Sequence, residues 1–149
     1  MARLTVLIVA LLLGLAGCTN KILSAFETNV EGTWEGTNSV TPQGGQTTAG
    51  PGRYVILPSS STTVLVTNFC KDGSGPVGTG ASTTATTFTL GKVLCPAEAQ
   101  GGCASVVSAI TGGTGAVDGG TLTMTFQGTA AGCSQTSAFT GDFTGARQQ

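Results

Sequence analysis

The segment Thr121–Gln127 alternates threonine with large apolar residues, reading Thr-Leu-Thr-Met-Thr-Phe-Gln. Successive side chains of a β-strand point to opposite faces of the sheet, so Leu122, Met124 and Phe126 share one face and the threonines share the other. A helix would scatter the same residues around its circumference. The segment therefore predicts a strand with one side toward a core and the other toward solvent.

Seven further segments have apolar or alternating patterns that predict strands: 30–40, 53–57, 62–69, 77–85, 88–94, 105–110 and 137–146. The chain is rich in threonine and has 24 glycines, while good helix formers are scarce after Phe26. Short connections between consecutive strands indicate an antiparallel meander. The sequence therefore predicts an all-β fold, a small antiparallel up-and-down barrel of about eight strands. A β-sandwich is the alternative, because spacing alone does not show closure.

Glycine-rich stretches outside these segments predict turns. Asp118-Gly119-Gly120 separates two strands, and Thr111–Gly115 is interpreted in the same way. The loops expected at one end of the barrel cover 42–51, 70–76, 95–103 and 128–133.

The N-terminus has the pattern of a secretory signal peptide. Arg3 supplies a positive charge, Leu4–Leu15 is almost wholly apolar, and small residues follow. The apolar run is shorter than the roughly 20 residues that a membrane-spanning helix needs. The run ends on Leu15-Ala16-Gly17-Cys18, which resembles the lipobox of bacterial lipoproteins.

That resemblance implies cleavage before Cys18 and attachment of a diacylglycerol to its sulfur, so that acyl chains such as palmitate hold the protein on a membrane. It divides the chain into a signal peptide (1–17), a lipidated cysteine and tether (18–29) and a β-barrel domain (30–149). The expected location is the bacterial cell envelope. Because Thr19 is not aspartate, the resemblance favours the outer membrane if the host is Gram-negative.

Lipidation of Cys18 leaves four cysteines, Cys70, Cys95, Cys103 and Cys133. An even number in an exported chain indicates disulfides. A zinc site is the rival interpretation, but the chain has no histidine and lacks paired close spacings. Strict strand alternation places all four cysteines at one end of the barrel. We expect Cys95 to pair with Cys103 and Cys70 with Cys133, with the other two connectivities left open.

The triplet Gly32-Thr33-Trp34 opens the first predicted strand and resembles the Gly-x-Trp signature of lipocalins and related calycins. The resemblance implies that Trp34 closes the bottom of the barrel and that Arg147, at the end of the last strand, packs over its ring. Strand alternation also places both residues opposite the cysteines. The alternative is a core tryptophan in an unrelated β-sandwich, with Arg147 in the chain terminus.

The sequence predicts no catalytic centre, metal site or cofactor. The absence of histidine removes Ser–His and Cys–His nucleophiles. Glu31 and Glu35 lie four apart on one strand and are expected to face outward rather than across a cleft. Only 9% of residues are charged and the net charge is −1, so no basic surface for nucleic acid is expected.

The predicted function is that of a membrane-anchored, non-catalytic surface or interaction module. Its partners would be the membrane, through the lipid on Cys18, and another envelope protein. The alternative is a lipocalin-like carrier of a small apolar ligand, held under the cysteine-rich loops. Few large aromatic residues favour the module, whereas an apolar void of several hundred Å³ under those loops would favour the carrier.

Overall fold

The computed structural model describes residues 30–80 and 85–149. The predicted signal peptide, Cys18 and the tether lie outside this part of the chain. The strands of the described part are β1 (Gly32–Pro42), β2 (Thr48–Pro58), β3 (Thr63–Thr67), β4 (Val77–Thr79), β5 (Thr87–Leu90), β6 (Val93–Leu94), β7 (Glu98–Gln100), β8 (Cys103–Asp118), β9 (Thr121–Gly132) and β10 (Gln135–Arg147). Within that part, no helix is long and apolar enough to cross a membrane.

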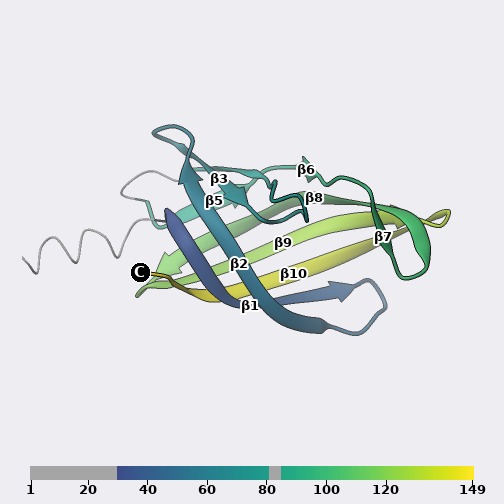
Figure 1. The fold of residues 1–149 in the computed structure, drawn as a ribbon. Coiled ribbons are helices and arrows are strands. Elements are labelled where there is room, and N and C mark those ends of the chain that lie inside the picture. Colours follow the sequence, from purple (N-terminus) through teal and green to yellow (C-terminus); the bar gives the residue numbers. More distant parts are fainter. Residues whose placement is uncertain (1–29, 81–84) are drawn as a thin grey trace, which may run out of the picture.

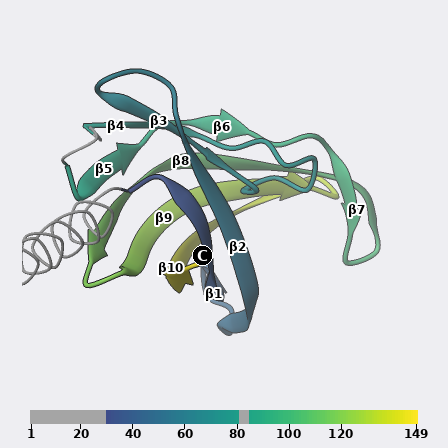
Figure 2. The same cartoon turned by 60° about the vertical axis from the view of Figure 1, so that its left-hand side comes forward.

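Eight strands form a closed antiparallel ring in the order β5-β4-β3-β2-β1-β10-β9-β8, with β5 pairing back onto β8. Each predicted strand segment supplies one strand of this ring, so the up-and-down barrel is confirmed and the sandwich is wrong. The ring closes at the end where the C-terminus lies, and β8, β9 and β10 continue well beyond it (Figures 1 and 2). The short strands β6 and β7 pair with that projecting part of β8.

The core follows the alternation read from β9. Leu122, Met124 and Phe126 are buried, while the threonines between them are exposed. The same pattern on the other strands completes one apolar cluster: Val30, Trp34, Tyr54, Ile56, Val64, Val66, Phe88, Leu90, Ile110, Val117 and Phe143 join the three β9 residues. Polar residues therefore lie mainly on the outer wall and at the open end.

Glycines face the aromatic rings inside this core. A Cβ atom at Gly115 would overlap the ring of Phe88, and a Cβ atom at Gly141 would overlap the ring of Phe126. Glycine inside a strand commonly marks such a close approach. The narrow barrel thus accommodates its large side chains by pairing them with residues that have none.

The turn predicted at 111–115 is wrong, because β8 runs without a break from Cys103 to Asp118. A bulge between Ile110 and Gly112 adds one residue opposite β9 and keeps Ile110, Gly115 and Val117 facing inward. The loop predicted at 128–133 is also wrong through Gly132, since these residues complete β9. The turn at Asp118–Gly120 is confirmed, with both glycines at positive φ.

Candidate functional site

Trp34 and Arg147 lie against each other at one end of the barrel, and we call this pair the plug. Trp34 is fully buried, and its indole N–H donates to the Val30 carbonyl over 3.0 Å. The guanidinium carbon of Arg147 lies 4.8 Å from the centre of the indole ring. The two residues also pair in the β1–β10 register. Partial burial at this plug lowers the pKa of Arg147 through desolvation, an effect that the nearby Glu31 charge opposes.

Gly32 sits beside the plug in a conformation that other residues rarely adopt. Its φ of +132° lies in the region that favours glycine, and an added Cβ would lie 3.5 Å from Arg147 Nε. The Gly-x-Trp triplet therefore has a local reason for its glycine: the backbone enters β1 directly beneath the arginine.

All four cysteines of the described part form disulfides, but the predicted pairing is wrong. The bonds join Cys70 to Cys95 and Cys103 to Cys133. Strand β6 pairs with β8, and the next residue, Cys95, continues along β8 by donating its N–H to the Ser108 carbonyl over 2.8 Å. This pairing places Cys95 beside the turn that begins at Cys70. Cys103 begins β8 and meets the β9–β10 turn. The strand registers place both disulfides on the side of the barrel away from Trp34, as predicted.

A hollow of about 340 Å³ lies at this open end, which we call the mouth pocket. The larger side chains of its apolar lining are Val40, Tyr54, Phe69, Ile110, Phe126 and Phe139, and Pro42, Ala130 and Ala138 complete it. Its polar lining comes from Asn38, Gln100, Ser108 and Ser137. Cys95 also lines it, and the set contains no Asp, Glu, Lys, Arg or His.

Aromatic rings from three elements and one connection meet at the inner side of the mouth pocket. Phe69 lies 4.7 Å from Tyr54 and 5.1 Å from Phe126, measured between ring centres, and the second pair is edge-to-face. Tyr54 also meets Phe143 edge-to-face at 4.8 Å. Such arrangements are favourable beyond the burial of area. Because Cys70 follows Phe69 directly, the Cys70–Cys95 disulfide fixes the segment that carries this ring over the pocket.

The pocket has one internal polar pair. The Tyr54 hydroxyl donates to Asn38 Oδ1 over 3.3 Å. Burial raises the pKa of Tyr54 to about 12, an effect that the hydrogen bond to Asn38 opposes. Tyr54 is therefore a neutral donor over the whole physiological pH range.

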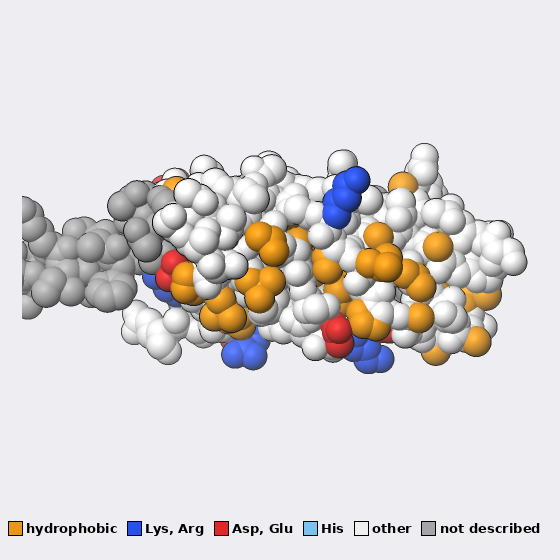
Figure 3. All heavy atoms as spheres, turned by 90° about the horizontal axis from the view of Figure 1, so that it is seen from above, with side chains coloured by type: hydrophobic (Ala, Val, Ile, Leu, Met, Phe, Trp, Pro, Cys, Tyr) orange, Lys and Arg blue, Asp and Glu red, His pale blue; other side chains and the backbone are white. Residues whose placement is uncertain are grey.

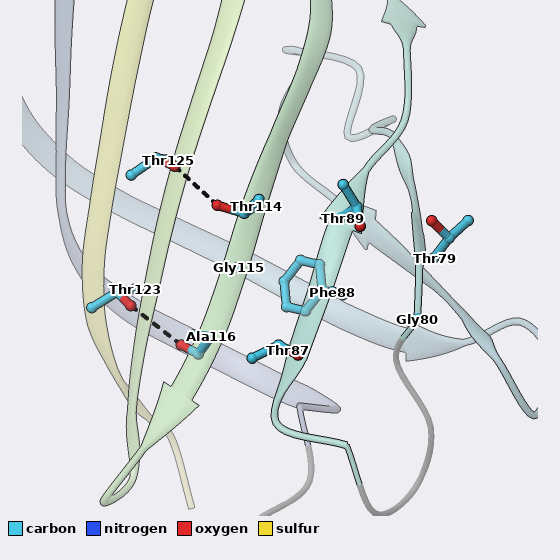
Figure 4. A pocket seen from close by; sticks show the side chains of 10 residues that line it. All are labelled: Thr79, Gly80, Thr87, Phe88, Thr89, Thr114, Gly115, Ala116, Thr123 and Thr125. Carbon is cyan, nitrogen blue, oxygen red and sulfur yellow. Dashed lines mark hydrogen bonds between the residues drawn. The ribbon is translucent and has the colours of Figure 1, made fainter.

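A second hollow, of about 430 Å³, lies on the outer wall over β4, β5, β8 and β9 (Figure 4). Four threonines of its lining lie side by side in the strand register: Thr79, Thr89, Thr114 and Thr125. Thr63 of β3 continues this row beyond the hollow. The hydroxyls of Thr114 and Thr125 lie 3.1 Å apart and bond to each other. The hollow is open to solvent, and its lining consists of threonines, Gly80, Gly115, Ala116 and one aromatic residue, Phe88. It therefore offers fewer aromatic contacts to a ligand than the mouth pocket does. The alternative prediction from the sequence placed a ligand under the cysteine-rich loops, where the mouth pocket lies, whereas the hollow on the outer wall was not predicted.

Charged groups are sparse and stay outside both hollows. Glu35 faces outward as predicted, and its Oε1 lies 3.2 Å from Arg53 Nε. Lys71 Nζ lies 3.8 Å from Glu98 Oε2. Across residues 30–80 and 85–149, no three potential ligands cluster to hold a metal ion. The side that carries β3 and β6 shows many apolar side chains with a few charged groups between them (Figure 3). On β6, Leu94 is 69% exposed.

Comparisons with known proteins add little to this geometry. No protein-family model matches the chain. No curated protein matches it either. Among solved structures, the chain is similar to a redesigned β-barrel, with a TM-score of 0.34 and 21% identity over 84% of this chain and 95% of the other.

Proposed function

We propose that this chain is an exported, lipid-anchored, non-catalytic protein that binds a small uncharged apolar ligand at the mouth of its barrel. The observation that carries the proposal is the mouth pocket. Its volume of about 340 Å³ lies at the lower end of the range for small-molecule sites, roughly 300–1,000 Å³. Its lining combines aromatic walls with a few polar groups, the usual composition of such sites.

The lining also supports a role in binding rather than catalysis. Acid–base and nucleophilic catalysis need groups that gain or lose protons near neutral pH. Tyr54 is the one titratable side chain of the lining, and its raised pKa keeps it protonated. Cys95 is held in a disulfide.

The proposed anchor and the pocket are compatible. The lipobox-like Leu15–Cys18 supports lipidation, and a tether of residues 18–29 reaches roughly 40 Å when fully extended. The chain then enters β1 at the Trp34 end, so the mouth pocket lies at the far end of the barrel from the anchor. In a Gram-negative host, the absence of aspartate directly after Cys18 favours the outer membrane. The Gly32–Trp34 triplet and the Arg147 contact support a relation to the lipocalin-like calycins.

The ligand site is tested with N-phenyl-1-naphthylamine, a neutral apolar dye whose fluorescence rises on leaving water. The wild-type protein is expected to bind it, and Ser108→Phe, which fills the pocket, is expected to weaken binding at least tenfold. Thr89→Leu alters the outer hollow and serves as the matched control, with binding unchanged. Equal binding by the wild type and Ser108→Phe would refute the site. Native mass spectrometry of protein extracted from its own host then shows whether a ligand mass is retained.

The anchor is tested separately by cell fractionation. The wild-type protein is expected in the membrane fraction and Cys18→Ser is expected to leave it. Retention of Cys18→Ser on the membrane would contradict the lipobox interpretation without affecting the pocket.

An interaction module is the second candidate, and one observation favours it. Leu57, Leu65 and Val77 form a cross-strand row on the outer face of β2, β3 and β4, and the first and last are 45% exposed. Exposed apolar rows of this kind can dock a partner protein. If an envelope protein binds there, Val77→Asp will dissociate a complex that wild-type protein forms in mild detergent extracts, while dye binding is unchanged.

A further inference from the structure

The polar pair inside the mouth pocket narrows the class of ligand. Asn38 lies on the inward face of β1, in register with Phe143 of β10 and with Gly50 of β2. Glycine at position 52 leaves room for it, because an added Cβ there would lie 2.9 Å from Asn38 Cβ. An amide is thus built into a wall that is otherwise mostly apolar.

Only one of the two polar atoms of the Asn38 side chain has a hydrogen-bond partner. Its Oδ1 accepts from the Tyr54 hydroxyl, whereas an asparagine amide nitrogen can donate two hydrogen bonds. No described residue accepts a hydrogen bond from that nitrogen. The nitrogen is not sealed off from solvent, because the described part has no fully buried side-chain N or O atom that lacks a partner. The half-buried Asn38 amide therefore offers its N–H groups to the pocket that it lines.

The remaining walls define the rest of the ligand. Tyr54, Phe69, Phe126 and Phe139 present ring faces and edges, which favour a flat aromatic body through stacked or edge-to-face contacts. The lining carries no formal charge, and an ionised group left unpaired in such surroundings is strongly disfavoured.

We infer that the mouth pocket recognises a neutral aromatic ligand bearing one hydrogen-bond acceptor, such as a carbonyl oxygen, which accepts from the Asn38 amide. This inference rests on the proposed function, because it names the class of ligand for the same pocket. Tyr54 acts as a positioning residue, since its hydroxyl fixes which end of the amide faces the ligand.

Two probes of matched shape test the inference: 2-acetylnaphthalene, which has a carbonyl, and 2-ethylnaphthalene, which lacks it. Their dissociation constants are measured by dye displacement for the wild type, Asn38→Leu and Ser108→Ala. Asn38→Leu is expected to weaken binding of the ketone about three- to tenfold and to leave the hydrocarbon unchanged or bound more tightly. Ser108→Ala, which removes another polar group from the lining, is expected to preserve the wild-type ratio between the probes.

Each outcome is informative. If Asn38→Leu weakens both probes equally, Asn38 has a structural role and the inference is overturned while the pocket stands. If neither probe binds the wild type, the proposed function fails and the inference fails with it. A measurement on wild-type protein alone covers the case in which Asn38→Leu does not fold: the infrared carbonyl band of the bound ketone, labelled with ¹³C, should shift to lower frequency than in hexane. An unshifted band would refute the hydrogen bond.

Discussion

The pairing of glycines with aromatic rings predicts a large difference between two Gly→Ala substitutions in strands. At Gly115, the new Cβ would lie 2.6 Å from Cε1 and Cε2 of Phe88, a residue that is 3% exposed. Overpacking of this kind costs about 1–3 kcal/mol. At Gly50, an added Cβ meets nothing within 4 Å, and φ is not positive. There the loss of backbone freedom in the unfolded chain should stabilise the fold by about 0.4–1 kcal/mol.

The two variants should therefore differ by about 1.4–4 kcal/mol in the free energy of unfolding. With a guanidinium m-value of about 3 kcal/mol/M, their midpoints differ by roughly 0.5–1.3 M. The fluorescence of Trp34, the single tryptophan, reports the transition. Phe88→Leu, which replaces the facing ring by a smaller side chain, should lower the free energy of unfolding by less in the Gly115→Ala background than in the wild type. Equal midpoints for Gly115→Ala and Gly50→Ala would refute the packing argument.

Three further predictions concern the polar pair, the plug and the disulfides. Tyr54 is the only tyrosine, so its absorbance at alkaline pH should titrate near 12 in the folded protein and near 10 in denaturant. Between pH 10 and pH 12 the unfolded chain binds fewer protons than the folded chain, so the free energy of unfolding should fall by about 3 kcal/mol over that range. A titration midpoint near 10 in the folded protein would contradict the burial of the hydroxyl. Arg147→Met keeps the apolar stem of the side chain but removes the cation from the face of the Trp34 indole. The free energy of unfolding should fall by about 0.5–1 kcal/mol. An unchanged unfolding midpoint would show that the cation does not stabilise the fold. Cleavage of unreduced protein after Lys, Arg and Glu should release the fragment that contains Cys70 linked to the fragment that contains Cys95. Fragment 99–147, which contains both Cys103 and Cys133, should be released separately. Pairing of Cys70 with Cys133 and of Cys95 with Cys103 would instead link all three fragments.

The strands of the ring were predictable because a strand with one buried face has a strong period of two in its sequence. Thr121–Gln127 shows this directly, and the structure buries its three apolar residues as the pattern requires. Strand order followed from short connections. Closure of the ring did not follow from the sequence, because β5 pairs with β8 and not with the next strands along the chain, β6 and β7. A pairing of this kind produces no pattern in the local sequence.

The errors arose where a residue's role depends on a distant strand. Gly113 and Gly115 have the composition of a turn, but in β8 they leave space for Leu90 and Phe88 of β5. Alternation placed the cysteines at the correct end of the barrel, but it did not show how far along that end each one lies. The short strands β6 and β7 decided the pairing, and their segments have no clear alternation.

The mouth pocket follows from a mismatch in strand length. Strands β8, β9 and β10 have 16, 12 and 13 residues, whereas β3, β4 and β5 have five, three and four. At about 3.3 Å per residue, the long wall extends tens of ångströms beyond the short one. The inner face of that projecting wall cannot be covered by ring strands, so the segments that carry Phe69 and Cys95 cover it instead. Ladder hydrogen bonds hold the long wall, but the segment with Phe69 is tied to β6 by the Cys70–Cys95 disulfide. The width of the pocket is therefore set by the sheet, and its cover depends on a covalent link, which persists in oxidising environments.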